Sequence, residues 1–166
     1  MAGAHEGPCT TLAFSPDGAL IASGGADHVV RLWTSIKTEI PLPFLGHADN
    51  VEGLAFSPDG RTMATAGKDH TIRIWNAARG TEVRTLAGHH GEALCVAFRS
   101  DGKVLASGGR DSMIRLWDAS TGDELRVLAG HAGQVNAIGF APAGTMLISG
   151  STDATVRLWE TRAFGN

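Results

Sequence analysis

The sequence predicts an all-β protein of the β-propeller class, with four blades per chain and a four-stranded antiparallel meander in each blade. Three observations support this fold class: a period of 42 residues, short runs of alternating apolar residues, and turn sequences between those runs. Repeats of about 20 to 50 residues built from short strands are typical of propellers, whose blades bury their faces against one another. We therefore expect a single domain over residues 1–166, with units 1–46, 47–88, 89–130 and 131–166.

The period of 42 residues is shared by several residue types and is not broken by any insertion. All four tryptophans follow it, together with one histidine, one aspartate, one phenylalanine, one glycine and one arginine in every unit. The last three types are Phe14, Phe56, Phe98 and Phe140; Gly18, Gly60, Gly102 and Gly144; and Arg31, Arg73, Arg115 and Arg157. Four units account for essentially the whole chain, so neither a second domain nor a linker is expected.

The strands are predicted from period-two runs, which in the second unit cover 51–56, 61–67, 71–75 and 82–88. The first turn reads SPDG in two units, which places a proline where a fixed φ helps and a glycine where a positive φ closes the hairpin. The other two units read RSDG and APAG, so the glycine is kept in all four. Each unit is therefore expected to fold as a meander.

The fourth strand of each unit is expected to be the outer edge strand. In the first unit the segment 39–47 carries Pro41 and Pro43, whose missing N–H groups point to the same side because the residues are two apart. Prolines are tolerated there only if that side faces solvent, and they also discourage pairing between sheet edges.

Composition and charge exclude several classes of partner. The formal charge is −3, with Lys and Arg spread along the chain, so nucleic acid is not expected as a partner. No apolar run reaches the length of a membrane span, and the N-terminal residues do not resemble a signal peptide. The two cysteines have neither disulfide nor metal spacing, so we expect a reducing cytoplasm. No cofactor or metal is expected, and His28, His70 and His90 are expected to be exposed.

Several short motifs resemble the WD40 repeat family. They are GH at 46–47, 88–89 and 130–131, the turns GGRD, AGKD and GSTD, and IRLWD at 114–118. The resemblance covers the whole chain, although Ala4 replaces the glycine before His5 and only Trp117 is followed by the aspartate that gives the family its name. It implies a propeller of four-stranded blades.

The resemblance also implies a buried hydrogen-bonded tetrad in each blade. The four sets are His5, Ser23, Asp27 and Trp33; His47, Thr65, Asp69 and Trp75; His89, Ser107, Asp111 and Trp117; and His131, Ser149, Asp153 and Trp159. A buried indole N–H needs an acceptor, a hydroxyl can accept it and donate onward to an imidazole, and a carboxylate can accept the other ring N–H. Such a chain would tie three strands of a blade together.

Ser, His and Asp are also the residues of a hydrolase triad, which is the alternative interpretation. That chemistry needs an exposed nucleophile, a substrate cleft and oxyanion donors. Four equivalent copies, each with its hydroxyl engaged by a tryptophan and one of them using Thr65, argue for a structural role. We expect no catalytic residues and no enzymatic activity.

The number of repeats predicts self-association. Both faces of a blade are apolar, so a row of four leaves two faces bare unless the ring closes, and propellers of this kind have about seven or eight blades. We therefore expect two chains to form a homodimer with eight blades. The sequence stops where the outer strand of the fourth unit should begin, so blade 4 is expected to have three strands, or the chain is a half-propeller excised or engineered from a longer one.

The predicted function is a non-enzymatic scaffold for protein–protein interaction, as the resemblance implies, with an unknown protein or peptide as the partner. Family partners dock on one ring face, at positions that are here Pro8, Thr10 and Ala26; Asn50, Glu52 and Lys68; Glu92, Leu94 and Arg110; and Gln134, Asn136 and Thr152. This set lacks the aromatic anchors of tight interfaces, so a merely solvated rim is an equal alternative. A second alternative is a purely structural or assembly fragment of a longer propeller of the bacterial signalling type.

Overall fold

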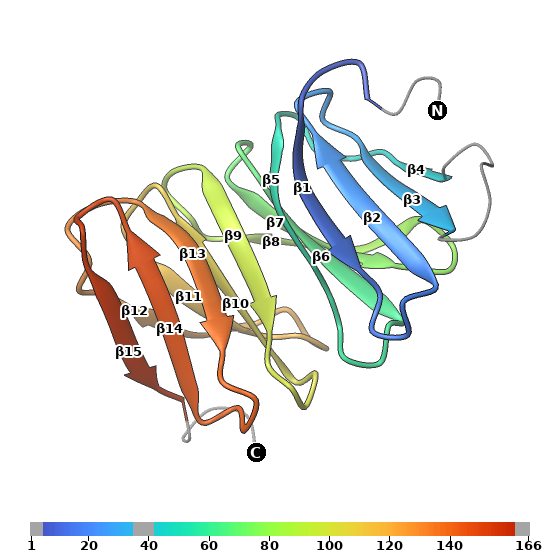
Figure 1. Cartoon of the computed structure of the whole chain (residues 1–166). Coiled ribbons are helices and arrows are strands. Elements are labelled where there is room, and N and C mark those ends of the chain that lie inside the picture. Colours follow the sequence, from blue (N-terminus) through green and yellow to red (C-terminus); the bar gives the residue numbers. More distant parts are fainter. Residues whose placement is uncertain (1–4, 35–41, 162–166) are drawn as a thin grey trace.

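The computed structural model describes residues 5–34 and 42–161, and all regular secondary structure in this part of the chain is β (Figure 1). Blade 1 consists of β1 (Cys9–Phe14), β2 (Leu20–Gly25), β3 (Val30–Thr34) and β4 (Leu42–Phe44). Blade 2 consists of β5 (Val51–Phe56), β6 (Thr62–Gly67), β7 (Thr71–Asn76) and β8 (Thr81–Ala87). Blade 3 consists of β9 (Ala93–Phe98), β10 (Val104–Gly109), β11 (Ile114–Asp118) and β12 (Glu124–Leu128). Blade 4 consists of β13 (Val135–Phe140), β14 (Met146–Ser151) and β15 (Val156–Glu160).

The predicted meander is confirmed in the first three blades, whose sheets run in the order of the sequence and are antiparallel throughout. Blade 4 has three strands among the described residues. The outer strand of blade 2 begins and ends one residue earlier than predicted, and it contains a bulge at Val83. Pairing across β7 and β8 passes from Ile74 opposite Arg84 to Trp75 opposite Glu82.

The first turn of each blade has the predicted backbone conformation. Gly18, Gly60, Gly102 and Gly144 have φ values of 71°, 68°, 72° and 69°. This left-handed conformation strains residues with a side chain, which explains why the glycine is the one position of the turn that does not vary. The outer position of the fourth strand is also confirmed, since β4, which contains Pro43, pairs with β3 and with no other strand of the described residues. Pro41 lies outside the described residues.

Apolar packing between successive blades forms the core. The inner strand of each blade packs on the inner strand of the next, so that β1 contacts β5, β5 contacts β9 and β9 contacts β13. One cluster of buried side chains fills each junction, and each combines residues of both blades. At the first junction, for example, Phe44 of blade 1 meets Trp75 of blade 2 edge-on, with ring centroids 5.7 Å apart.

Close approach between blades depends on small residues in the second strand. A Cβ atom added at Gly24 would lie 2.7 Å from a methyl carbon of Val51, and one added at Gly108 would lie at the same distance from Val135. At the junction between these two, the corresponding residues are Ala66 and Ala93, which belong to one buried cluster. A glycine therefore faces a valine at two junctions, and an alanine faces an alanine at the third.

The two end faces of the row are open. Leu12 of β1 is 67% exposed, whereas its counterpart Leu54 in blade 2 is 9% exposed. At the other end Leu158 of β15 is 68% exposed, whereas its counterpart Leu116 in blade 3 is fully buried. No contact comparable to those between neighbouring blades joins β13, β14 or β15 to blade 1 among the described strands.

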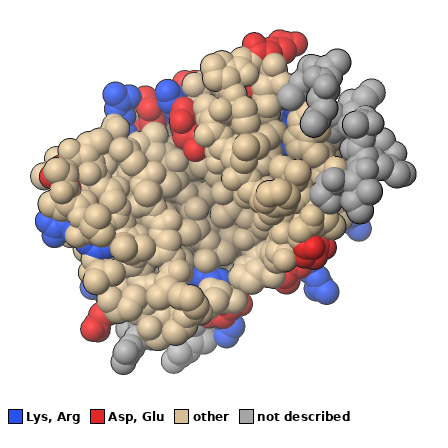
Figure 2. Space-filling view, viewed as in Figure 1, with Lys and Arg blue, Asp and Glu red and all other residues tan. Residues whose placement is uncertain are grey.

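The side from which β1, β2, β13 and β14 are seen in front is a broad, mostly uncharged surface (Figures 1 and 2). Charged side chains gather near its margin in that view. No helix in the described residues is long and apolar enough to cross a membrane.

The small-residue pairing at the blade junctions can be tested by a double-mutant cycle in urea denaturation. Gly108→Ala should lower the free energy of unfolding by about 1 to 3 kcal/mol, because the new methyl group overlaps Val135 and the Cys95 sulfur. Combining it with Val135→Ala, which recreates the alanine pair of the neighbouring junction, should cost less than the sum of the two single changes.

The matched control for this cycle is Gly139→Ala. A Cβ atom there would meet only Ile148, at 3.8 Å, and the other three blades already carry an alanine at this position. It should change stability by less than about 0.5 kcal/mol. Equal effects of Gly108→Ala and Gly139→Ala, or strict additivity in the cycle, would contradict the packing described here.

Candidate functional site

The four repeated polar sets lie inside the blades, and the structure brings the members of each set together. In blade 3, Trp117 Nε1 donates to Ser107 Oγ at 2.9 Å, and this hydroxyl lies 2.8 Å from His89 Nε2. His89 Nδ1 lies 3.0 Å from both carboxylate oxygens of Asp111. The hydroxyl comes from β10, the indole from β11, the histidine from the segment before β9, and the aspartate from the turn after β10.

The other three blades repeat this geometry. The distance from the indole nitrogen to the hydroxyl oxygen is 3.0 Å for Trp33 and Ser23, 2.8 Å for Trp75 and Thr65, and 2.9 Å for Trp159 and Ser149. The distance from His Nε2 to the same hydroxyl is 2.8 Å for His5, 2.7 Å for His47 and 2.8 Å for His131. The distance from His Nδ1 to the carboxylate is 2.7 Å for Asp27, and 2.9 Å for both Asp69 and Asp153.

Proton accounting assigns one state to the sets of blades 2, 3 and 4; in blade 1, Arg31 Nη1, which can only donate, also lies 2.7 Å from His5 Nδ1. The hydroxyl accepts the indole N–H, so its own proton is free to be donated to His Nε2, which must then be unprotonated. The imidazole proton sits on Nδ1 and is donated to the carboxylate. Burial lowers the pKa of His89, which agrees with a neutral ring. Every donor and acceptor within these three sets is satisfied, as buried polar groups require.

The aspartates are held ionised by hydrogen bonds. Burial by itself would raise the pKa of Asp69, but donors from His47, the Ala48 N–H and Thr71 outweigh it and hold the pKa below its usual range. In blade 4 the hydroxyl of Thr155 is the strongest of the groups that lower the pKa of Asp153. Each carboxylate thus joins the chain before the first strand to the turn after the second.

The hydroxyls of the four sets are inaccessible to a substrate. Ser107 and Thr65 are fully buried, and Ser149 and Ser23 are 1% and 3% exposed. Each of these oxygens already accepts a hydrogen bond from an indole. A nucleophile must reach the reacting carbon atom of its substrate, so this arrangement does not supply one.

The arginine two residues before each tryptophan has partners that the sequence did not identify. Arg73 Nη1 is paired with Glu82 of β8, and Arg115 Nη1 with Glu124 of β12. In blade 1 the position corresponding to Glu82 is Ile40, which lies outside the described residues, and Arg31 instead donates to Asp27 at 2.6 Å. The two glutamates are 42 residues apart, and this spacing was the signal that could have found them.

The proposed rim residues lie at the start of the first strand and in the turn after the second. Two pairs of them form ion pairs: Lys68 Nζ lies 3.3 Å from Glu52, and Arg110 Nη1 lies 2.6 Å from Glu92. Thr10 is exposed, but its hydroxyl donates to Gly24 O at 2.9 Å. The rest are exposed or half-buried: Pro8, Ala26, Asn50, Leu94, Gln134, Asn136 and Thr152.

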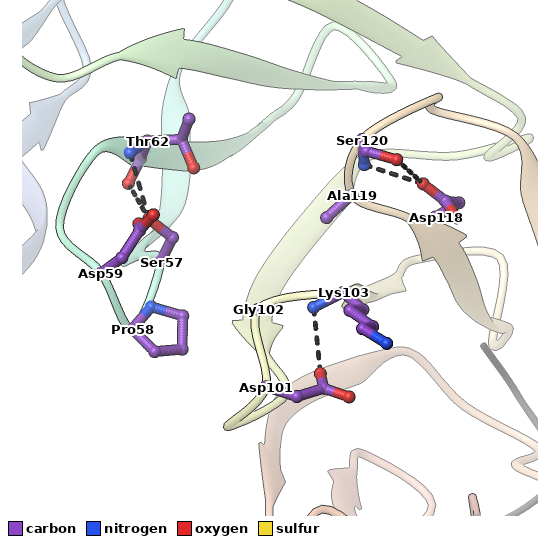
Figure 3. Close-up of a pocket in the computed structure, with 10 residues that line it drawn as sticks. All are labelled: Ser57, Pro58, Asp59, Thr62, Asp101, Gly102, Lys103, Asp118, Ala119 and Ser120. Atoms are coloured by element: carbon purple, nitrogen blue, oxygen red, sulfur yellow. Dashed lines mark hydrogen bonds between the residues drawn. The ribbon is translucent and has the colours of Figure 1, made fainter. Parts of the chain in front are cut away.

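A hollow of about 540 Å³ lies between blades 2 and 3, at the end of the blades opposite the rim (Figure 3). It is lined by Ser57, Pro58, Asp59, Thr62, Asp101, Gly102, Lys103, Asp118, Ala119 and Ser120. Two of its carboxylates accept hydrogen bonds from hydroxyls of their own turns. Asp59 accepts from Ser57 Oγ at 2.6 Å, and Asp118 accepts from Ser120 Oγ at 2.6 Å. No motif in the sequence points to this hollow.

No group of three or more His, Cys, Asp or Glu residues is arranged to hold a metal ion within the described part of the chain. His28, His70 and His90 are exposed, as expected. Cys9 is exposed and Cys95 is buried, and both are free thiols. Burial raises the pKa of the Cys95 thiol to about 12.

The hydroxyl at the centre of a set can be tested by conservative replacement. Ser107→Ala should lower the free energy of unfolding by about 1 to 3 kcal/mol, because it leaves the buried indole N–H without an acceptor and the imidazole without a donor. Ser107→Thr should cost much less, since blade 2 uses Thr65 at the same position. Denaturant unfolding of both variants checks this, and equal losses would contradict the bonding scheme.

Stability should fall as the solution is acidified. A carboxylate whose pKa is lowered by folding contributes stability that is complete above its unfolded pKa, about 3.9, and that is lost as pH falls. The lowered pKa of His89 acts in the same direction, because protonation of the ring below about pH 6.5 favours the unfolded chain. Denaturant unfolding measured from pH 7 to pH 3 should show a falling free energy.

Asp111→Asn serves as the control for this pH dependence. The variant should be less stable at pH 7 and should lose less stability than the wild type between pH 5 and pH 3, since its amide cannot be protonated there. A parallel decline in both proteins would contradict the role given to Asp111.

Comparison with known families gives matches along most of the chain. The profile of the WD domain, G-beta repeat family matches residues 3–34, 39–76, 80–118 and 122–160. Each matched segment contains one complete set of histidine, hydroxyl, aspartate and tryptophan. No curated protein matches the chain. Because the four matched segments cover most of its length, the chain belongs to the WD40 repeat family.

Proposed function

We propose that this protein is a non-enzymatic scaffold for protein–protein interaction and that two copies associate into an eight-bladed ring. WD40 repeats typically act as scaffolds of this kind. The observation that carries the proposal is the family match over four repeats, with its polar sets enclosed in the blades rather than open to a substrate. We further propose that the protein works in the cytoplasm.

The rim is the part of the scaffold that we propose for docking. The ion pairs Glu52–Lys68 and Glu92–Arg110 lie in the two central blades, whereas the corresponding residues of blades 1 and 4 are uncharged. Charge pairs at a surface fix the orientation of a partner more than they add affinity. The side chain of Arg110 is 59% exposed, so its guanidinium is accessible to a partner.

Self-association is supported by the two open end faces. The face of blade 4 that carries Ile148, Val156 and Leu158 corresponds to the faces of blades 1 to 3 that pack on the next blade. The face of blade 1 that carries Leu12 and Phe14 corresponds to the faces that receive the preceding blade. The two surfaces are therefore the two halves of the junction that this chain already makes three times.

Two copies joined by two such junctions would form a closed ring. A head-to-tail contact closes when the rotation that it imposes completes a full turn, and otherwise it continues as an open filament. Four blades correspond to about half of an eight-bladed propeller. Alternatively, further blades of a longer protein would cover the same two faces. In that case this segment would be purely structural and would have no ligand of its own.

Association can be tested by sedimentation velocity over a dilution series. The sedimentation of the wild type should correspond to a species with twice the 17.3 kDa mass of the chain. Leu12→Asp should weaken association at least about a hundredfold, because it would place an unpaired charge in an apolar junction. Val83→Asp is the control: Val83 is also exposed, but it lies on the outer strand β8, so its replacement should have no effect. A monomeric wild type, or equal effects of both variants, would contradict the ring.

Docking on the rim can be tested by affinity capture from a lysate of the source cells. A protein captured by the wild type should be lost when Glu92→Ala and Arg110→Ala are combined, since this pair is accessible and does not contribute to the core. Asp59→Ala combined with Arg61→Ala removes an exposed pair from the opposite end of blade 2 and should leave capture intact. Retention by the first variant, with its fold preserved, would contradict docking on this rim.

A further inference from the structure

The junction between blades 1 and 2 includes a polar contact at the start of the inner strands. The Thr10 hydroxyl lies 2.9 Å from Gly24 O of its own blade, and it also forms a hydrogen bond with Val51 O of blade 2. A Cβ atom added at Gly24 would lie 2.7 Å from a methyl carbon of Val51. The threonine therefore joins the two blades at a place where a glycine lets them approach closely.

Blade 4 carries the same pair of positions without a neighbouring blade. Asn136 occupies the position of Thr10 in the repeat, and Gly150 that of Gly24. Asn136 is exposed, and its amide has no hydrogen-bond partner among the described residues. A Cβ atom added at Gly150 would meet nothing within 4 Å, whereas Gly24 and Gly108 each face a valine of the next blade. A glycine inside a strand weakens it and often marks the close approach of another backbone.

The two other first strands lack a donor at this position. They carry Glu52, whose carboxylate can only accept hydrogen bonds, and Leu94, which is apolar. Glu52 is paired instead with Lys68 of its own blade. Blade 4 thus resembles blade 1, and not blades 2 and 3, in presenting a polar donor beside a glycine to whatever covers its end face.

An asparagine can serve both carbonyl groups of such a junction at once. A hydroxyl has one proton to donate, whereas the side-chain amide of asparagine has two N–H donors. One can reach Gly150 O in the same blade, as Thr10 reaches Gly24 O. The other faces the next blade. In the ring proposed above, that blade is blade 1 of a second copy, in which Cys9 occupies the repeat position of Val51.

We propose that Asn136 positions the ring-closing junction by donating one amide hydrogen bond to Gly150 O of its own blade and the other to the Cys9 carbonyl of a second copy. This contact rests on the proposed function, because it requires two chains to join end to end. The Cys9 backbone enters the space that Gly150 leaves open, as Val51 does beside Gly24. Asn136 is thus a positioning residue of the self-association surface.

Sedimentation velocity over a dilution series measures the contribution of this contact. Asn136→Ala should raise the dissociation constant of the dimer at least about tenfold, because the ring contains the contact twice. Asn136→Thr should restore most of the affinity, since Thr10 makes the same contact within the chain. Gln134→Ala removes an amide two residues earlier in the same blade and should leave association unchanged.

Urea unfolding at a concentration where the chain is monomeric separates association from folding. Asn136→Ala should unfold there at the same urea concentration as the wild type, since this side chain is exposed in the single chain. Equal dimer dissociation constants for the wild type and Asn136→Ala, an equal loss in Gln134→Ala, or no rescue by threonine would overturn the contact and leave the ring standing. A wild type that stays monomeric would overturn the ring and the contact together, so the two failures are distinguishable.

Discussion

The packing of one blade against the next is the interaction on which the rest of this structure depends. A single four-stranded sheet with two apolar faces cannot be stable alone in water, and it becomes so only when neighbours cover both faces. Residues such as Leu54 and Leu116 are buried because a blade lies on each side, and Leu12 and Leu158, at the same repeat positions, are exposed because one side is empty. Equivalent positions of the repeat are therefore buried or exposed according to whether a neighbouring blade covers them.

The polar sets make each blade stiff enough to present such a face. The hydroxyl and indole of a set come from two strands, the imidazole from the segment before the first strand and the carboxylate from the turn after the second. Their relative positions are fixed by a chain of satisfied hydrogen bonds. Enclosure in the blade keeps the hydroxyls of these sets, which have the composition of a hydrolase triad, out of reach of a substrate. The side chains that remain accessible include those of the rim and of the two end faces.

Much of the fold could be predicted because most of its features are repeated in every unit. The strands, the left-handed glycine of the first turn and the members of each polar set all recur every 42 residues, so each is seen four times. The features that sequence reasoning missed lack this fourfold repetition. Glu82 and Glu124 occur in only two units, and the bulge at Val83 depends on strand pairing that no local motif reports. The exchange of a glycine–valine pair for an alanine pair becomes visible only once the contacting strands are known.

Covalent trapping of the proposed ring tests the central claim most directly. In the ring, Gly150 of one copy and Cys9 of the other would occupy the positions that Gly108 and Val135 occupy within the chain, where an added Cβ lies 3.0 Å from the valine Cβ. Disulfides join Cβ atoms about 3.5 to 4.5 Å apart, so the two strands need to separate by only about 0.5 Å for the bond to form. Gly150→Cys under mild oxidation should therefore give a covalent dimer that reducing agent separates. An intramolecular bond, a ladder of larger multimers, or no bond at all would contradict the account.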